Sequence, residues 1–241
     1  MSGWRKPWSC DHRAVREVVE GVFELPVGYV NMHLVVVDDG VVLVDTGLPG
    51  RSATIERALH GIRRTVGDVR TVLLTHHHPD HVGGVADLRR RSGARVVAHA
   101  ADAPFVRGEA RAVVRHPVVR LVALVMGTPE PSPVDVVLEA DGVSPVPGFT
   151  AVHTPGHTAG HVSYLLDRGD GLLFAGDAAA GKRGGRVGST PRMVSADLGA
   201  QARSVEKLAG LEFGHAVFGH GGAVSGRAVE RFREFAARAA G

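Results

Sequence analysis

Short apolar runs separated by turn residues fill the first hundred residues of the chain. They are rich in β-branched side chains and lie at residues 18–25, 31–37, 41–45, 72–75 and 95–99. Runs of this length and composition are typical of β-strands. Residues 52–62 and 85–91, between these runs, have the apolar spacing of helices. The first half of the chain therefore predicts a sheet with helices packed against it.

A second series of apolar runs follows in the other half of the chain. These runs lie at residues 134–139, 150–153, 162–166, 172–175 and 216–218. Residues 196–211 and 227–240 predict helices. Strands clustered in both halves, with helices after them, predict an α+β protein with two sheets face to face and helices outside.

Residues 100–133 interrupt this pattern. They combine a cationic, apolar, helix-like stretch with a run rich in proline and glycine at residues 127–133. Connections this long are often functional. Three interpretations remain open: a plain surface insertion, a lid over the functional site, or a contact through which a dimer forms.

Composition narrows the class of protein. The chain has 241 residues, of which 44% are hydrophobic, so it can bury a substantial core. The single cysteine, Cys10, excludes a disulfide framework and any multi-thiolate metal site. The formal charge is only +3 and the basic residues are dispersed, so we expect no nucleic-acid partner.

The chain also lacks the usual membrane signals. A membrane-spanning helix needs about 20 apolar residues in a row, and the most apolar stretch, residues 112–126, is interrupted by Arg115 and Arg120. The first residues lack the apolar segment of a signal peptide. We therefore expect no membrane association and a cytoplasmic location.

Four residues of metal-binding types, three histidines and one aspartate, follow the predicted strand at residues 72–75. They form the pattern His76-x-His78-x-Asp80-His81. Side chains alternate along extended chain, so the first three can point to one side, and a tight turn can bring His81 to a second ion. Imidazole and carboxylate groups suit Zn, Fe or Mn.

Three more candidate ligands lie near the ends of other predicted strands. His157 is flanked by turn residues, Asp177 closes an apolar strand, and His220 follows the run at residues 216–218. A metal site gathers loops at one edge of a fold, so these residues are expected to join the histidine motif.

Five motifs occur in an order that resembles the metallo-β-lactamase superfamily, over about residues 22–222. They are Asp45-Thr46-Gly47, the histidine motif, His153-Thr154-Pro155-Gly156-His157-Thr158, the Gly-Asp strand end at 177 and the Gly-His-Gly around 220. The resemblance implies an αββα sandwich. We expect a single domain of this kind over residues 1–241, with the insertion at about 100–133.

The resemblance also implies a ligand set for two divalent ions, of which zinc is favoured and iron or manganese are alternatives. It assigns His76, His78 and His157 to one ion, Asp80, His81 and His220 to the second, and Asp177 to both. Asp45 and His161 would support these ligands by hydrogen bonds, as residues behind metal ligands often do.

Two neighbouring divalent ions imply hydrolytic chemistry on a small molecule. A water bridging them loses a proton near neutral pH, and the resulting hydroxide attacks a carbonyl carbon. Asp80 would orient it and help to move its proton. The expected substrate is a thioester, an ester or a lactone.

The glyoxalase II-like group of the superfamily is the most similar one. At the distance where that group carries an anion-binding basic residue, this chain has Arg186, with Lys182 nearby. A planar guanidinium suits a carboxylate. The aromatic residues expected next are replaced by Val187-Gly188-Ser189, and the tyrosine of quorum-signal lactonases is replaced by Ala180.

Two other functions are compatible with the same candidate ligands. A persulfide dioxygenase-like enzyme would use a single iron held by His76 or His78, His157 and Asp177. A non-catalytic metal-binding module is the other alternative, although a structural site normally closes with four ligands and this chain offers seven.

Overall fold

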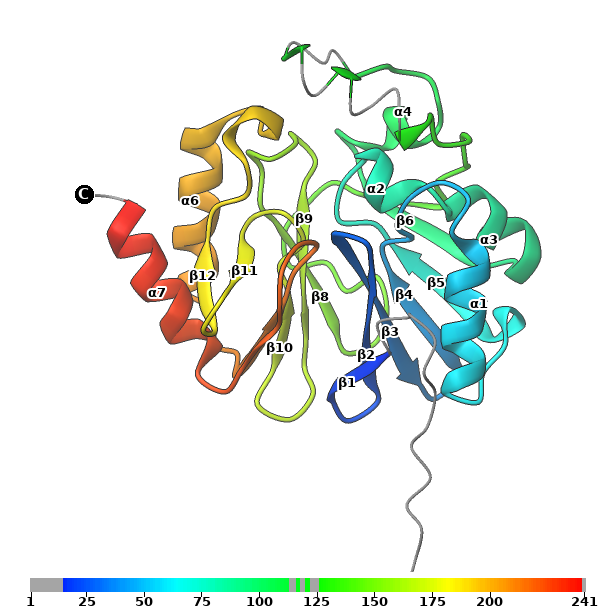
Figure 1. The fold of residues 1–241 in the computed structure, drawn as a ribbon, viewed down its shortest axis with the longest axis horizontal. Helices are drawn as coiled ribbons and strands as arrows, with labels where there is room; N and C mark the ends of the chain where they lie inside the picture. The colour runs from blue at the N-terminus through cyan, green and yellow to red at the C-terminus, as the bar shows by residue number, and fades with distance from the viewer. Residues whose placement is uncertain (1–14, 113–115, 118–119, 122–125, 240–241) are drawn as a thin grey trace, which may run out of the picture.

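Two β-sheets pack face to face in the computed structural model, and helices cover the outer face of each (Figure 1). The structure describes residues 15–112, 116–117, 120–121 and 126–239. The arrangement confirms the predicted αββα sandwich. The N-terminal segment with Cys10 and part of the predicted insertion at 100–133 lie outside the described residues.

The first sheet has seven strands, which lie side by side in chain order. They are β1 (Arg16–Val19), β2 (Val22–Val27), β3 (Val30–Val37), β4 (Gly40–Val44), β5 (Val69–Leu73), β6 (Arg95–His99) and β7 (Val136–Leu138). Strands β4 to β7 run parallel to one another, so the loops that follow them leave from one edge. The run predicted as one strand at 18–25 forms parts of two, because the chain turns at Gly21 with φ of 70°.

The second sheet has five strands in a crossed order. They are β14 (Val224–Ser225), β13 (His215–Val217), β10 (Leu172–Phe174), β9 (Val162–Leu166) and β8 (Phe149–His153). Residues 180–188 form a separate hairpin of β11 (Ala180–Lys182) and β12 (Arg186–Gly188). Gly184 and Gly185 make its turn with φ of 75° and 66°, which glycine adopts without strain.

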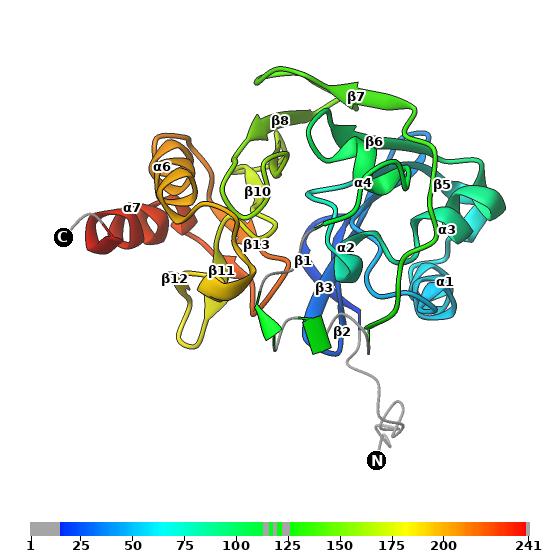
Figure 2. The same cartoon turned by 90° about the horizontal axis from the view of Figure 1, so that it is seen from above.

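Helices form the two outer layers, as Figures 1 and 2 show from two directions. The first sheet carries α1 (Ser52–Gly61) and α3 (Val85–Ser92), and the second carries α6 (Leu198–Ala209) and α7 (Ala228–Ala239). Short helices α2 (Pro79–Val82) and α4 (Ala103–Val106) lie near the upper edge in Figure 1. Within the described residues, none of the helices has the length and apolar character needed to cross a membrane.

Alternation along the strands creates three apolar layers between the four structural layers. In β3, Leu34 belongs to the core under α1 and α3, while the next residue, Val35, belongs to the core between the sheets. Tyr164 and Phe174 face Val35's layer from the second sheet, and a third core lies under α6 and α7. Burial of each large side chain stabilises the fold by about 1.5–3 kcal/mol.

Candidate metal centre

The strand ends of both sheets meet at one edge of the sandwich. Two backbone hydrogen bonds join the sheets there: Val162 N–H donates to Thr75 O (2.8 Å), and Asn31 N–H donates to Gly219 O (2.8 Å). The loops after β5, β8, β10 and β13 therefore converge, and they carry the candidate ligands.

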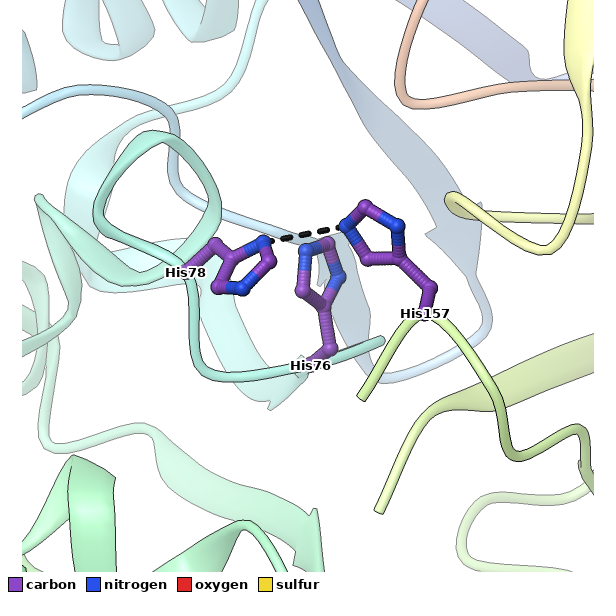
Figure 3. Close-up of side chains that lie close together, drawn as sticks. All are labelled: His76, His78 and His157. Atoms are coloured by element: carbon purple, nitrogen blue, oxygen red, sulfur yellow. Dashed lines mark hydrogen bonds between the residues drawn. The ribbon is translucent and has the colours of Figure 1, made fainter. Parts of the chain in front are cut away.

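Three histidines from the two sheets form one compact group (Figure 3). His76 and His78 come from the loop after β5, and His157 comes from the loop between β8 and β9. One ring nitrogen from each lies within 4.8 Å of the others. His78 Nδ1 and His157 Nε2 are 3.0 Å apart, so their rings point toward one another across His76.

A hydrogen bond fixes which nitrogen of His76 carries the proton, and burial keeps all three rings of this group uncharged. Thr75 Oγ1 donates its only proton to Asp45 Oδ2 (2.7 Å), so it accepts from His76 Nδ1–H (3.0 Å). His76 Nε2 is left with a lone pair that faces the group. Burial lowers the pKa of His76 and of His157 well below the usual value, and it lowers the pKa of His78 to about 4. The three rings are therefore neutral, the form that binds metal ions.

A second group combines a carboxylate with two histidines. The turn of α2 places Asp80 and His81 next to each other, and His220 reaches them from the loop after β13. Their ligand atoms lie within 4.8 Å of one another, with His220 Nε2 at 3.6 Å from Asp80 Oδ2. His220 Nδ1–H donates to Tyr29 O (2.8 Å), so the other nitrogen faces the group.

His81 differs from the first three histidines because acids surround it. Its Nδ1–H donates to Asp45 Oδ2 at 2.7 Å. Burial lowers its pKa, but the carboxylates of Asp45, Asp177 and Asp80 outweigh burial and raise the pKa to about 10. A metal ion at His81 Nε2 would therefore replace a proton.

Asp177 lies between the two groups. Its Oδ2 is 3.3 Å from His157 Nε2 and 3.2 Å from His220 Nε2, and its Oδ1 is 3.6 Å from His81 Nε2. Burial raises its pKa, but the neighbouring histidines outweigh burial and bring the pKa below the usual value. The side chain is thus a buried carboxylate within reach of both sets of nitrogens.

The donor atoms fit divalent metal ions. His76 Nε2, His81 Nε2 and Asp177 Oδ1 are buried and make no hydrogen bond within the described residues. Such unsatisfied atoms are costly, and bound cations would satisfy them. A methyl group at Gly219 would collide with Asp177 Oδ1 and His81, so glycine keeps this space open. Imidazole and carboxylate ligands suit Zn, Fe or Mn.

Asp45 and His161 hold the group from behind. Asp45 adopts a left-handed backbone with φ of 60°, which is uncommon outside glycine and turns its carboxylate toward Thr75 and His81. His161 Nε2 accepts the Asp177 backbone N–H (2.8 Å), and its Nδ1–H donates to Thr154 Oγ1 (2.8 Å). Both ring nitrogens of His161 are occupied, so it orients Asp177 and has no lone pair for an ion.

A family model described as the metallo-beta-lactamase superfamily matches residues 25–220. The chain belongs to this superfamily. The match confirms the resemblance that the sequence motifs indicated, and the fold agrees with it.

The chain is similar to several named hydrolases and to solved structures of the superfamily. A hydroxyacylglutathione hydrolase of Albidiferax ferrireducens is 37% identical over 131 residues, which cover 53% of this chain and 42% of that enzyme. The "Probable metallo-hydrolase YflN" of Bacillus subtilis is 27% identical over 235 residues and 88% of both chains. A metallo-beta-lactamase family protein of Thermus thermophilus superposes with a TM-score of 0.68 at 29% identity, over 93% of this chain and 81% of that one. The chain thus spans less than half the length of the first relative.

The two candidate anion-binding residues of this chain lie on the β11–β12 hairpin. Lys182 and Arg186 face each other across it and are exposed. Arg186 Nε donates to Arg183 O at 3.3 Å. Gly181 N–H donates to His220 O at 3.0 Å, which attaches the hairpin to the loop of a candidate ligand. The role of both cations in substrate binding stays a prediction.

Three residues at the centre were missed in the sequence. Asn31 Nδ2 donates to Phe218 O (3.1 Å) and Gly221 O (2.7 Å), which fixes the loop of His220. The half-exposed Tyr29 ring stacks on His220 with centroids 5.5 Å apart. The third is Asp102, which lies three residues after the end of β6. An acidic residue after a buried strand was the available signal.

Proposed function

We propose that this chain is a metal-dependent hydrolase that holds two divalent ions, preferably zinc, and cleaves a thioester, an ester or a lactone. The observation that supports this proposal most is the set of buried nitrogen and carboxylate atoms without hydrogen bonds, at the edge where the two sheets meet. The names of the relatives, hydroxyacylglutathione hydrolase and probable metallo-hydrolase, support hydrolysis.

The proposed ligands follow the two groups of the structure. One ion would be held by His76, His78 and His157, the second by Asp80, His81 and His220, and Asp177 would contact both. When bound, the ions would activate a water molecule for attack and polarise the carbonyl group of the substrate.

The protein's own groups would position the reactants and move the proton. Asp80 is 8% exposed and lies beside His220, where a carboxylate can accept the proton of the attacking water and pass it to the leaving group. Asp45 and the Tyr29 carbonyl fix the rings of His81 and His220. The Tyr29 side chain stays a phenol, because its partial burial and the charges of Asp80 and Asp177 raise its pKa.

The substrate side of the site would lie near the β11–β12 hairpin. Lys182 and Arg186 give this hairpin two exposed cations, and β11 is bonded to the His220 loop. A substrate with a carboxylate in its acyl or leaving group would complement them.

The proposal is tested with protein loaded with zinc and freed of excess metal. kcat/KM is measured on a panel of thioesters, esters, lactones and a β-lactam, with Asp177→Asn purified in parallel as the control for contaminating hydrolases. We expect turnover of at least one carbonyl substrate that a chelator abolishes and the variant lacks. Oxygen uptake with a persulfide by an iron-loaded sample, without any hydrolysis, would overturn the proposal in favour of sulfur oxidation. Metal binding without turnover on any substrate would favour a non-catalytic module.

A further inference from the structure

Asp102 is a buried acid that the ligand set does not use. It follows β6 and precedes α4, and 1% of its surface is exposed. A buried carboxylate is costly unless several donors satisfy it. The hydrogen-bond donors around Asp102 therefore indicate which parts of the chain it holds in place.

The Asp102 carboxylate bonds to two loops at once. Oδ2 accepts the His77 backbone N–H (3.0 Å) and the Thr158 hydroxyl (2.8 Å), and Oδ1 accepts the Gly160 backbone N–H (2.9 Å). His77 Nδ1 also lies 3.0 Å from Oδ2. Burial raises the pKa of Asp102, but these donors outweigh it and bring the pKa below its usual value. The group is ionised and fully engaged.

These two loops carry the three-histidine group. His77 separates His76 from His78 in the first loop, and Thr158 directly follows His157 in the second. A Cβ at residue 160 would lie 2.6 Å from Asp102 Oδ1, so the glycine lets the second loop approach the carboxylate closely. The loops come from different sheets, and Asp102 joins them in addition to the backbone bond from Val162 N–H to Thr75 O.

We propose that Asp102 is a positioning residue that sets the separation of His78 and His157, and through it the affinity and geometry of the three-histidine metal site. The proposal rests on the proposed function, because it assumes that this group holds an ion. Residues that orient metal ligands typically change metal affinity by about 10–100-fold when they are replaced.

Asp102→Asn is the direct test, since it keeps the shape of the side chain. Its amide nitrogen must face one of the donors, so at least one of the loop contacts is lost. Cobalt(II) binding to the metal-free protein is followed by visible absorption and by competition with a chelator. We expect the three-histidine site to bind cobalt about 10–100-fold more weakly than in the wild type, with an altered absorption spectrum, and the Asp80–His81–His220 site to keep its affinity.

Two further variants separate positioning from general stability. Thr158→Val removes only the hydroxyl contact, and we expect a smaller loss of affinity in the same direction; it decides the matter if Asp102→Asn does not fold. Asp135→Asn is the matched control, because Asp135 also accepts a backbone N–H, from Val96, and an arginine, Arg89, but contacts neither loop. We expect it to bind cobalt as the wild type does.

The outcomes distinguish this inference from the proposed function. A lower unfolding temperature of Asp102→Asn with wild-type cobalt affinity and spectrum would mean a purely structural role and would overturn the inference alone. A wild-type protein that binds no cobalt would overturn the proposed function and the inference with it.

Discussion

The two halves of the candidate metal centre use the same residue type in opposite electrostatic settings. His76, His78 and His157 are packed against one another, and burial lowers the pKa of each. His81, in the other half, is equally buried, but three carboxylates raise its pKa to about 10. The surroundings thus keep the three histidines neutral and keep His81 protonated when no metal is bound.

This difference shows how the surroundings of a histidine decide what metal binding must displace. An ion at the three-histidine group meets rings that are already neutral, because burial lowers their pKa values. An ion at the Asp80–His81–His220 group must replace the proton of His81. Asp177 lies within reach of both groups, so we expect it to couple them.

The two halves also differ in what holds them. The Asp102 carboxylate joins the loops of the three-histidine group. The Asn31 amide and the Tyr29 carbonyl hold the loop of His220 in the other half. Each half therefore has its own polar link between the sheets, and each can be disturbed separately.

The largest effect is expected from Asp177→Ala, which removes the residue common to both halves. Metal content should fall at both sites. kcat/KM should drop by more than about 100-fold, the largest loss typical of replacing a residue that only orients a metal ligand. Elemental analysis and steady-state kinetics on the chosen substrate measure the two effects. Full metal content with wild-type activity would contradict a role for Asp177 at either site.

Replacing one ligand in each half should separate the two sites. We expect His78→Ala and His220→Ala each to lose about one ion per chain, and His78→Ala to lose most activity. Metal content and chelator competition identify which ion is missing. Full activity in His78→Ala would overturn the assignment of the three-histidine site.

Proton release on metal binding should distinguish the two halves without an activity measurement. His81 has a pKa of about 10 in the metal-free protein, so it carries a proton at pH 7 that an ion displaces, while His78, with a pKa of about 4, carries none. Zinc titrations of His78→Ala and His220→Ala are compared by calorimetry in buffers of different ionisation enthalpy. We expect about one proton released per ion in His78→Ala and almost none at the three-histidine site of His220→Ala. Equal release in both variants would contradict the electrostatic difference.

The smallest effect on metal binding is expected from shortening the 100–133 segment. Its two ends are anchored: Ala103 and Val106 are in the core, and Ser132 N–H donates to Val106 O (3.0 Å). A short glycine-serine link in place of residues 109–131 keeps Asp102 and removes the contact of Tyr29 with Met126. We expect unchanged metal content and an altered substrate range. Loss of metal would contradict a role confined to the substrate side.

Local patterns predicted most of the fold and the candidate ligands. Apolar runs marked the strands, and the motif from His76 to His81 is contiguous, so its chemistry was visible in the sequence. The supporting contacts were not, because they join distant residues: Asp102 and Thr158 are 56 positions apart, and Asn31 and Gly221 are 190 apart. The three-residue strands β11 and β12 are too short to show a period and depend on the glycine turn between them.

The metal content of the wild-type protein, purified without a chelator and measured by elemental mass spectrometry against protein concentration, tests the central claim most directly. We expect about two divalent ions per chain, mostly zinc, with about one remaining in His78→Ala and in His220→Ala. One iron per chain would contradict the two-ion site, and no metal, even after incubation with zinc, would contradict the metal centre itself.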